Sequence, residues 1–226
     1  MYETLLQWFG YGLCHQLPER SFFGGGVQVP VCARDTGIYV GFLVSVLVIT
    51  AMQRNRPTGL PPLSVSILMG GFVLAMAADG LTSYAGLRET SNLTRLVTGL
   101  MAGYAMGALA LPLLNDQLWR NGSHDRVLGT GRAVAMWLAS LAIAVPALWW
   151  VAPLLGALYP LLVVLSILGT LTLVNLILVC LLPAFERRAD RVSDAWTQLL
   201  VAFALSWVEV ALSALLKYGL VRISGG

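Results

Sequence analysis

Residues 155–182 read LGALYPLLVVLSILGTLTLVNLILVCLL, a stretch that contains no charged side chain. A helix needs about 20 consecutive, mostly apolar residues to cross the hydrocarbon core of a bilayer. A stretch of this length and composition therefore predicts a transmembrane helix. Because the stretch is longer than a span requires, we expect the helix to tilt in the membrane.

The sequence on both sides of this stretch repeats the pattern. Comparable apolar runs occupy residues 36–53, 62–81, 93–114, 131–151 and 196–221. Hydrophobic residues make up 58% of the 226-residue chain, and charged residues make up only 11%. Soluble domains carry about 25% charged residues, so this chain has too few to cover a water-facing surface. The sequence predicts an all-α, polytopic integral membrane bundle with six transmembrane helices.

We expect residues 1–226 to form a single membrane domain. Within it, residues 1–35 form an N-terminal interfacial helix and a motif loop, and residues 36–221 form the six spans. Leu6, Trp8 and Phe9 predict that the N-terminal helix lies in the headgroup region, where aromatic residues are favoured. The net charge is only +3 and the basic residues are scattered. This excludes a nucleic-acid surface, which needs Lys and Arg clustered on one face.

The distribution of basic residues predicts the orientation of the bundle. Eight arginines occupy the first, third and fifth interhelical loops, with Arg132 counted at the start of the fourth span, and six basic residues occupy the other side. By the positive-inside rule, the N-terminus then lies outside the cytoplasm.

Three polar segments fall on this same, N-terminal side of the predicted bundle. They are Cys14-His15-Gln16 with Pro18-Glu19-Arg20-Ser21; Cys32-Ala33-Arg34-Asp35-Thr36-Gly37; and Asp79-Gly80 with Arg88-Glu89-Thr90-Ser91-Asn92 and Arg95. Counting the spans places the three segments together, although they are far apart in sequence. The sequence therefore predicts one shared site, outside the cytoplasm.

Helical phase refines this prediction for the third span. Thr90 or Ser91 is a good N-cap, and the following residues on one stripe are Asn92, Arg95, Gly99, Gly103 and Gly107. Glycines at this spacing allow a second helix to approach closely, so Asn92 and Arg95 point into the bundle. Arg34 has the same relation to Gly37 and Gly41 in the first span.

An arginine at a helix N-terminus is disfavoured by the helix dipole. Arg34 and Arg95 therefore need an anionic partner, and the candidates are Asp35, Asp79, Glu89 or a bound phosphate. The alternative is a closed network of salt bridges that only fastens the helices, because such networks resemble active sites.

Cys14, His15, Cys32 and Asp35 form a candidate metal set. Thiolate, imidazole and carboxylate groups are all zinc ligands. Two alternatives stay open: Cys14 and Cys32 form a disulfide, which an external location permits, or they are two unlinked thiols.

Two spans carry polar residues at membrane depth. Glu209 lies on a stripe of the last span with Ser206, and Asn175 lies midway along the fifth span. An ionisable residue within a span is a functional candidate, so a transporter or channel is an alternative function. The equal alternative is a protonated glutamate that only forms a hydrogen bond between two helices.

At these motifs the chain resembles an uncharacterised prokaryotic membrane-protein family, catalogued as domain of unknown function 2085. The resemblance covers about residues 10–107 and includes the three polar segments, with Ile38-Tyr39 and Thr98-Gly99. It implies a membrane protein of bacterial or archaeal type and brings no agreed activity. It also implies that Cys often replaces Asp35 among relatives, an exchange that fits a metal ligand because both residues bind zinc as anions.

From the residues, we expect a membrane-embedded enzyme acting at the lipid–water interface on a phosphate-bearing lipid, by metal-assisted hydrolysis or transfer. The predicted roles are as follows: Asp79, Glu89 and Asp35 are catalytic; Arg34, Arg88, Asn92, Arg95 and Arg20 bind the substrate; and Cys14, His15, Cys32 and Asp35 hold a divalent metal, zinc above others. The expected partners are membrane lipids, with a phospholipid or polyprenyl phosphate as substrate, in a prokaryotic plasma membrane. An accessory subunit with a structural metal is a further alternative.

Overall fold

A computed structural model describes residues 2–223 of the chain. Its helices are α1 (Tyr2–Tyr11), α2 (Ala33–Met52), α3 (Leu63–Tyr84), α4 (Asn92–Leu118), α5 (Gly131–Pro146), α6 (Leu158–Cys180) and α7 (Trp196–Ile223). Its strands are β1 (Ser21–Gly24), β2 (Val27–Cys32), β3 (Pro57–Gly59) and β4 (Ser123–Arg126). Four single turns, η1 to η4, cover Pro18–Arg20, Ala147–Val151, Ala152–Leu155 and Val192–Ala195.

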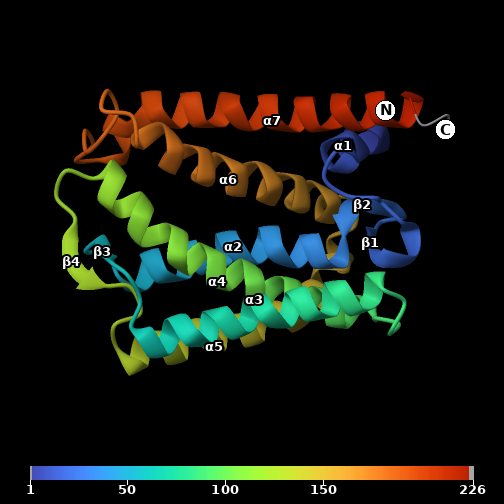
Figure 1. The fold of residues 1–226 in the computed structure, drawn as a ribbon, viewed down its shortest axis with the longest axis horizontal. Helices are drawn as coiled ribbons and strands as arrows, with labels where there is room; N and C mark the ends of the chain where they lie inside the picture. Colours follow the sequence, from blue (N-terminus) through green and yellow to red (C-terminus); the bar gives the residue numbers. More distant parts are fainter. Residues whose placement is uncertain (1, 224–226) are drawn as a thin grey trace.

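Six helical segments are long and apolar enough to cross a membrane, which confirms the predicted all-α polytopic bundle. Two of them include adjoining turns: α5 continues through η2 and η3 to Leu155, and the last span starts with η4. The long helices run side by side along the longest axis of the molecule (Figure 1). Loops and short strands gather at the two ends of the bundle.

The boundaries of the spans differ from the prediction by a few residues, for local reasons. The first span begins at Ala33 because Cys32, in an extended conformation, is its N-cap. Ser91 caps α4 as predicted, since its side chain accepts a hydrogen bond from the backbone N–H of Thr94 at 3.1 Å. The same helix continues past Pro112 to Leu118, beyond the predicted end at 114. Membrane helices tolerate such a proline because neighbouring groups satisfy the freed backbone carbonyl.

The centre of the bundle is the contact between α2 and α4. Glycines on α4 lie directly against the backbone of α2. A Cβ atom placed on these glycines would overlap atoms of α2. At Gly99 it would lie 2.1 Å from the carbonyl oxygen of Arg34, and at Gly103 it would lie 2.3 Å from that of Ile38. This confirms that the glycine stripe lets the helices pack closely, and it fixes Arg34 and Arg95 next to each other at one end.

Helix α7 lies at the edge of the bundle, against α6 and α1 (Figure 1). A single stripe of α7 is buried, and it includes Ser206. On α6, the Asn175 side-chain amide donates to Ser206 Oγ at 3.2 Å and to Glu209 Oε2 at 3.0 Å. The two polar groups predicted at membrane depth therefore bond to each other across the α6–α7 contact.

A β-hairpin closes one end of the bundle, and the sequence did not predict it. β1 and β2 pair antiparallel, and the turn between them uses Gly25 and Gly26 at positive φ angles of 58° and 81°. The hairpin packs on η3 and on the start of α6. At the opposite end, β3 and β4 form a short parallel pair.

Candidate functional site

A constrained turn carries Cys14 and His15 to the hairpin end of the bundle. Gln16 has a φ angle of 55°, a left-handed conformation that is rare outside glycine. Its side-chain amide donates to the carbonyl oxygens of Gln7 at 2.6 Å and Pro30 at 2.9 Å. These bonds hold the strained turn against α1 and β2, so the position of Cys14 is fixed by the fold rather than by a mobile loop.

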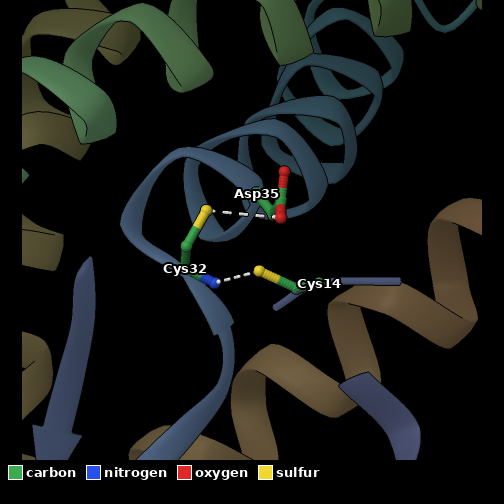
Figure 2. Close-up of side chains that lie close together, drawn as sticks. All are labelled: Cys14, Cys32 and Asp35. Atoms are coloured by element: carbon green, nitrogen blue, oxygen red, sulfur yellow. Dashed lines mark hydrogen bonds between the residues drawn. The ribbon is translucent and has the colours of Figure 1, made fainter. Parts of the chain in front are cut away.

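Cys14, Cys32 and Asp35 meet beside the N-terminus of α2 (Figure 2). The backbone N–H of Cys32 donates to Cys14 Sγ at 3.2 Å, and Cys32 Sγ donates to Asp35 Oδ2 at 3.3 Å. The three potential ligand atoms all lie within 4.8 Å of one another. Cys32 is the N-cap and Asp35 lies one turn further on, which explains why their side chains face each other.

The two thiols of this cluster have very different acidities. A hydrogen bond from the Cys32 side chain lowers the pKa of Cys14 to about 5, against an opposing effect of burial. The same interaction raises the pKa of Cys32, and burial raises it further. Neither cysteine is bonded to another in this structure. The two thiols are close but unlinked here, and Cys14 is the more acidic of the two.

This cluster fits a tetrahedral metal ion in ligand type and spacing. With metal–sulfur distances near 2.3 Å, the ligand atoms of a tetrahedral zinc site lie roughly 4 Å apart. Thiolates are soft ligands, which favour zinc over magnesium or calcium. Three protein ligands leave a fourth position open, as in catalytic zinc sites. His15, the predicted fourth ligand, is exposed and lies outside the group of three.

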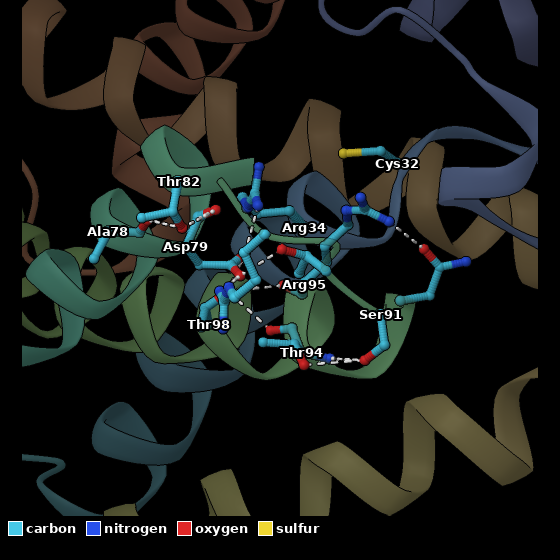
Figure 3. A network of polar contacts seen from close by, with 12 residues as sticks. Cys32, Arg34, Ala78, Asp79, Thr82, Ser91, Thr94, Arg95 and Thr98 are labelled. Carbon is cyan, nitrogen blue, oxygen red and sulfur yellow. Dashed lines mark hydrogen bonds and ion pairs between the residues drawn. The ribbon is translucent and has the colours of Figure 1, made fainter. Parts of the chain in front are cut away.

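Asp79 is the centre of a second, purely polar network (Figure 3). Its side chain is 2% exposed, and its two oxygens form ion pairs with Arg34 and Arg88. Thr90 Oγ1 donates to it at 3.1 Å and Thr98 Oγ1 at 3.5 Å. The oxygens of the carboxylate are thus fully occupied. This arrangement favours a role in positioning the arginines over the predicted role as a proton acceptor.

Arg95 differs from Arg34 because it has no acidic partner. Its Nη1 donates to Asn92 Oδ1 at 3.0 Å, and the Asn92 amide donates to the carbonyl oxygen of Glu19 at 3.1 Å. Although Arg95 is only 8% exposed, it forms no ion pair with any carboxylate among residues 2–223. Arg34 also keeps a free donor, because its buried Nε has no hydrogen-bond partner. Both guanidinium groups therefore retain N–H donors that the described chain does not satisfy.

A narrow pocket joins the thiol cluster to these arginines. About 20 Å³ in volume, it is lined by Cys14 and Cys32 together with Arg20, Arg34 and Arg95. The guanidinium of Arg20 lies 5.9 Å from the ring centre of Tyr84, at the wall of the pocket. Thiol ligands and arginines, of which Arg34 is paired with Asp79, thus line the same space.

The remaining predicted residues lie around this pocket in different settings. Arg88 is half-exposed and contributes through Asp79. Glu89 is exposed and forms no hydrogen bond or ion pair within the described part of the chain. The sequence reasoning missed the roles of Gln16, Thr90 and Thr98. Thr98 lies one turn after Arg95 on the same helix face, which is the signal that could have identified it.

Comparisons with known proteins match the part of the chain that carries these residues. A family model described as "Predicted membrane protein (DUF2085)" matches residues 14–109, which include the thiol cluster and the Asp79 network. An uncharacterized protein of Methanocaldococcus jannaschii is 35% identical over 108 residues, covering 48% of this chain and 67% of the relative. An uncharacterized protein of Methanothermobacter thermautotrophicus is 34% identical over 97 residues, covering 43% of this chain and 83% of the relative.

No solved structure matches the chain. The matched segment runs from Cys14 to the middle of α4, so the similarity is concentrated on the elements that build the pocket. An integral membrane location follows from the family and from the six candidate spans. On these grounds the chain belongs to the family of predicted membrane proteins known as DUF2085.

Proposed function

We propose that this protein is a membrane-embedded enzyme that acts at the lipid–water interface on a phosphate-bearing lipid, by metal-assisted hydrolysis or transfer. The observation that carries the proposal is the composition of one pocket. Cys14 and Cys32 line it together with Arg20, Arg34 and Arg95. A metal-type ligand set lies beside Arg20 and Arg95, which form no ion pair with a carboxylate among the described residues, and this is suited to an anionic substrate such as a phosphate ester.

The arginines have distinct roles in this proposal. Arg95 donates free N–H groups to the phosphate oxygens through charge-assisted hydrogen bonds, and Arg34, held by Asp79, adds positive charge beside it. Arg20 adds positive charge at the wall of the pocket. Asp79 and Asn92 are positioning residues, since each holds one of these guanidinium groups in place. The low polarity around them strengthens their attraction for a phosphate.

The metal ion would be held by Cys14, Cys32 and Asp35. The exposed His15 directly follows Cys14 in the sequence. When bound there, a divalent metal supplies Lewis-acid chemistry at the phosphate. Since Asp79 is occupied by two arginines, Glu89 is the predicted catalytic carboxylate that is left free to accept a proton. The site opens on the side of the membrane that we predict to be extracytoplasmic.

The first test measures phosphate release from phosphatidate and from a polyprenyl phosphate by the purified protein in vesicles. Arg95→Ala should lower the rate about 100-fold or more, the usual effect of removing a key donor to a developing charge. Its thermal stability should stay near that of the wild type, because Arg95 has no carboxylate that the substitution would leave unpaired. Arg95→Lys should restore only part of the activity, since lysine lacks the bidentate geometry.

Loss of folding in Arg95→Ala would instead support the alternative in which the network only fastens the helices. Activity in Arg95→Ala equal to the wild type would contradict the proposed phosphate clamp. Arg188→Ala, in the loop before η4 at the opposite end of the bundle, serves as the matched control for removing a positive charge.

A second test determines the metal content of the purified protein beside its free thiols. We expect one zinc ion per chain, and its loss in Cys14→Ser and in Cys32→Ser. Cys180→Ser should keep the metal, because Cys180 lies in α6 outside the cluster. Two free thiols at positions 14 and 32 with no bound metal would remove the metal from the proposal.

A transporter or channel is the second candidate function, and one observation favours it. Glu209, midway along α7, is exposed at the edge of the bundle while it bonds to Asn175. An ionisable group at that depth is costly unless it is used. Ion or proton flux in vesicles that Glu209→Gln abolishes would favour transport. Co-purification with fixed partners would favour an accessory subunit.

A further inference from the structure

A second hollow adjoins the thiol cluster, since Cys14 lines it as well. It is an open groove of about 410 Å³ between the end of α1 and the last turns of α7. Leu13, Cys14 and His15 form one wall, and Leu216, Lys217 and Leu220 form the other. Ligand sites of this size, mostly apolar with a few polar groups, are typical of small-molecule pockets.

The groove and the arginine pocket share two lining residues, Cys14 and His15. The two hollows differ sharply in character. Three arginines line the pocket, whereas Lys217 is the one Lys or Arg side chain among the described residues that lines the groove. Lys217 Nζ donates to the Cys14 carbonyl oxygen at 2.8 Å and lies 4.6 Å from the ring centre of Tyr11. The positive charge of the groove is thus fixed at its junction with the thiol cluster.

The other walls of the groove face the surroundings of the bundle. Leu216 is 68% exposed and Leu220 is 67% exposed, and both belong to a segment that can span the membrane. In a bilayer, such side chains contact acyl chains. A lipid tail can therefore reach the groove laterally, without crossing the layer of polar headgroups.

From these shared lining residues we infer that the groove binds the hydrocarbon tail of the same phosphate-bearing lipid whose phosphate lies against the arginines of the narrow pocket. The inference rests on the proposed function and makes it more specific. The substrate enters sideways between α1 and α7, and its phosphate stops at Cys14, where Lys217 and the arginines supply positive charge. A water-soluble phosphate ester leaves the groove empty and binds more weakly.

The experiment compares two neighbouring leucines of α7. Leu216→Trp fills the groove, and Leu215→Trp is the matched control, because Leu215 is 65% exposed but does not line the groove. The full-length protein in phosphatidylcholine nanodiscs is titrated with dioleoyl phosphatidate, dihexanoyl phosphatidate and glycerol 3-phosphate. Thermal unfolding of both variants controls for folding.

We expect the dioleoyl lipid to bind the wild type at least about tenfold more tightly than glycerol 3-phosphate, because buried methylene groups add to affinity. Leu216→Trp should remove most of this difference and leave glycerol 3-phosphate binding unchanged. Leu215→Trp should bind all three probes as the wild type does.

Equal affinity for the three probes, or equal effects of the two substitutions, would overturn the inference and leave the arginine pocket intact as a phosphate site. A different outcome would support the groove and contradict the proposed enzyme. If the dioleoyl lipid binds with the expected chain-length dependence but no metal and no phosphate release are found, the groove stands and the proposed enzyme fails.

Discussion

The two ends of the bundle use the same residue types with different consequences. At the hairpin end, Asp79 is 2% exposed and pairs with Arg34, which is 10% exposed at its side chain. At the opposite end, Asp190 pairs with Arg120 and Asp116 pairs with Arg187, and all four side chains are at least 40% exposed. Exposed pairs contribute little to stability, about 0–1 kcal/mol, because water screens them. A buried pair is different, because removing one partner leaves an uncompensated charge.

Arginine content alone therefore does not identify a site. The opposite end carries more arginines, but the two ion pairs described there are solvated. Only at the hairpin end do glycines let α2 and α4 approach closely enough to remove the arginines from water. Burial excludes competing water, so the positive charge of these side chains attracts an anion more strongly there than at the solvated end.

The largest expected effect is that of Asp79→Ala. It leaves the buried Arg34 without its carboxylate, and we expect a loss of about 3–5 kcal/mol in the free energy of unfolding. Asp116→Ala removes a comparable but solvated pair and should cost about 1 kcal/mol or less. Unfolding followed by circular dichroism in detergent micelles measures both. Equal losses of unfolding free energy in the two variants would show that the buried ion pair contributes no more to stability than the solvated one.

A smaller effect is expected from a methyl group at the contact of α2 and α4. In Gly99→Ala the new Cβ meets the Arg34 carbonyl oxygen, so the helices must move apart, at a cost of about 1–3 kcal/mol. Gly131→Ala, at the start of α5 on the opposite end, meets nothing within 4 Å and should be neutral or slightly stabilising. Thermal unfolding of the two variants measures the difference. A neutral Gly99→Ala would show that the close approach of the helices is not required.

The smallest expected effect is a difference in alkylation rate between the cysteines at the two ends of the bundle. The pKa of Cys14 is lowered to about 5, so above that pH it is a thiolate, whereas an ordinary thiol titrates near 8.5. In metal-free protein at about pH 6, Cys14 should react with iodoacetamide about tenfold faster than Cys32, whose pKa is raised. Buried Cys180, at the opposite end, should react slowest.

Peptide mass spectrometry after timed labelling gives the three rates. Alkylation of Cys14 should slow only as the pH falls through about 5, since protonation then removes the thiolate. Equal rates at Cys14 and Cys32 at about pH 6 would show that the two thiols are not coupled as described.

The length and composition of the apolar segments determine much of the fold. The six spans, the Ser91 cap and the glycine stripe each depend on residues within one or two helical turns. The β-hairpin was not predicted, because its short strands carry no long alternating pattern. Its formation depends on packing against η3 and α6, which are distant in sequence.

The candidate site divides in the same way. Counting spans was enough to place Cys14, Arg34 and Asp79 at one end of the bundle. It was not enough to separate Arg34, which Asp79 neutralises, from Arg95, which has no acidic partner among the described residues. Nor did it give the groove beside Lys217, whose walls come from opposite ends of the chain.

The sequence by itself therefore determined that the chain crosses the membrane and which end carries the reactive residues, because both depend on local hydrophobicity and on the parity of the spans. Only the tertiary structure decided which charges are paired, which thiol is acidic and which hollows adjoin the cluster. Those properties depend on distances of a few ångströms between elements that are far apart in sequence, such as α2 and α4 beside the arginines and α1 and α7 beside the groove.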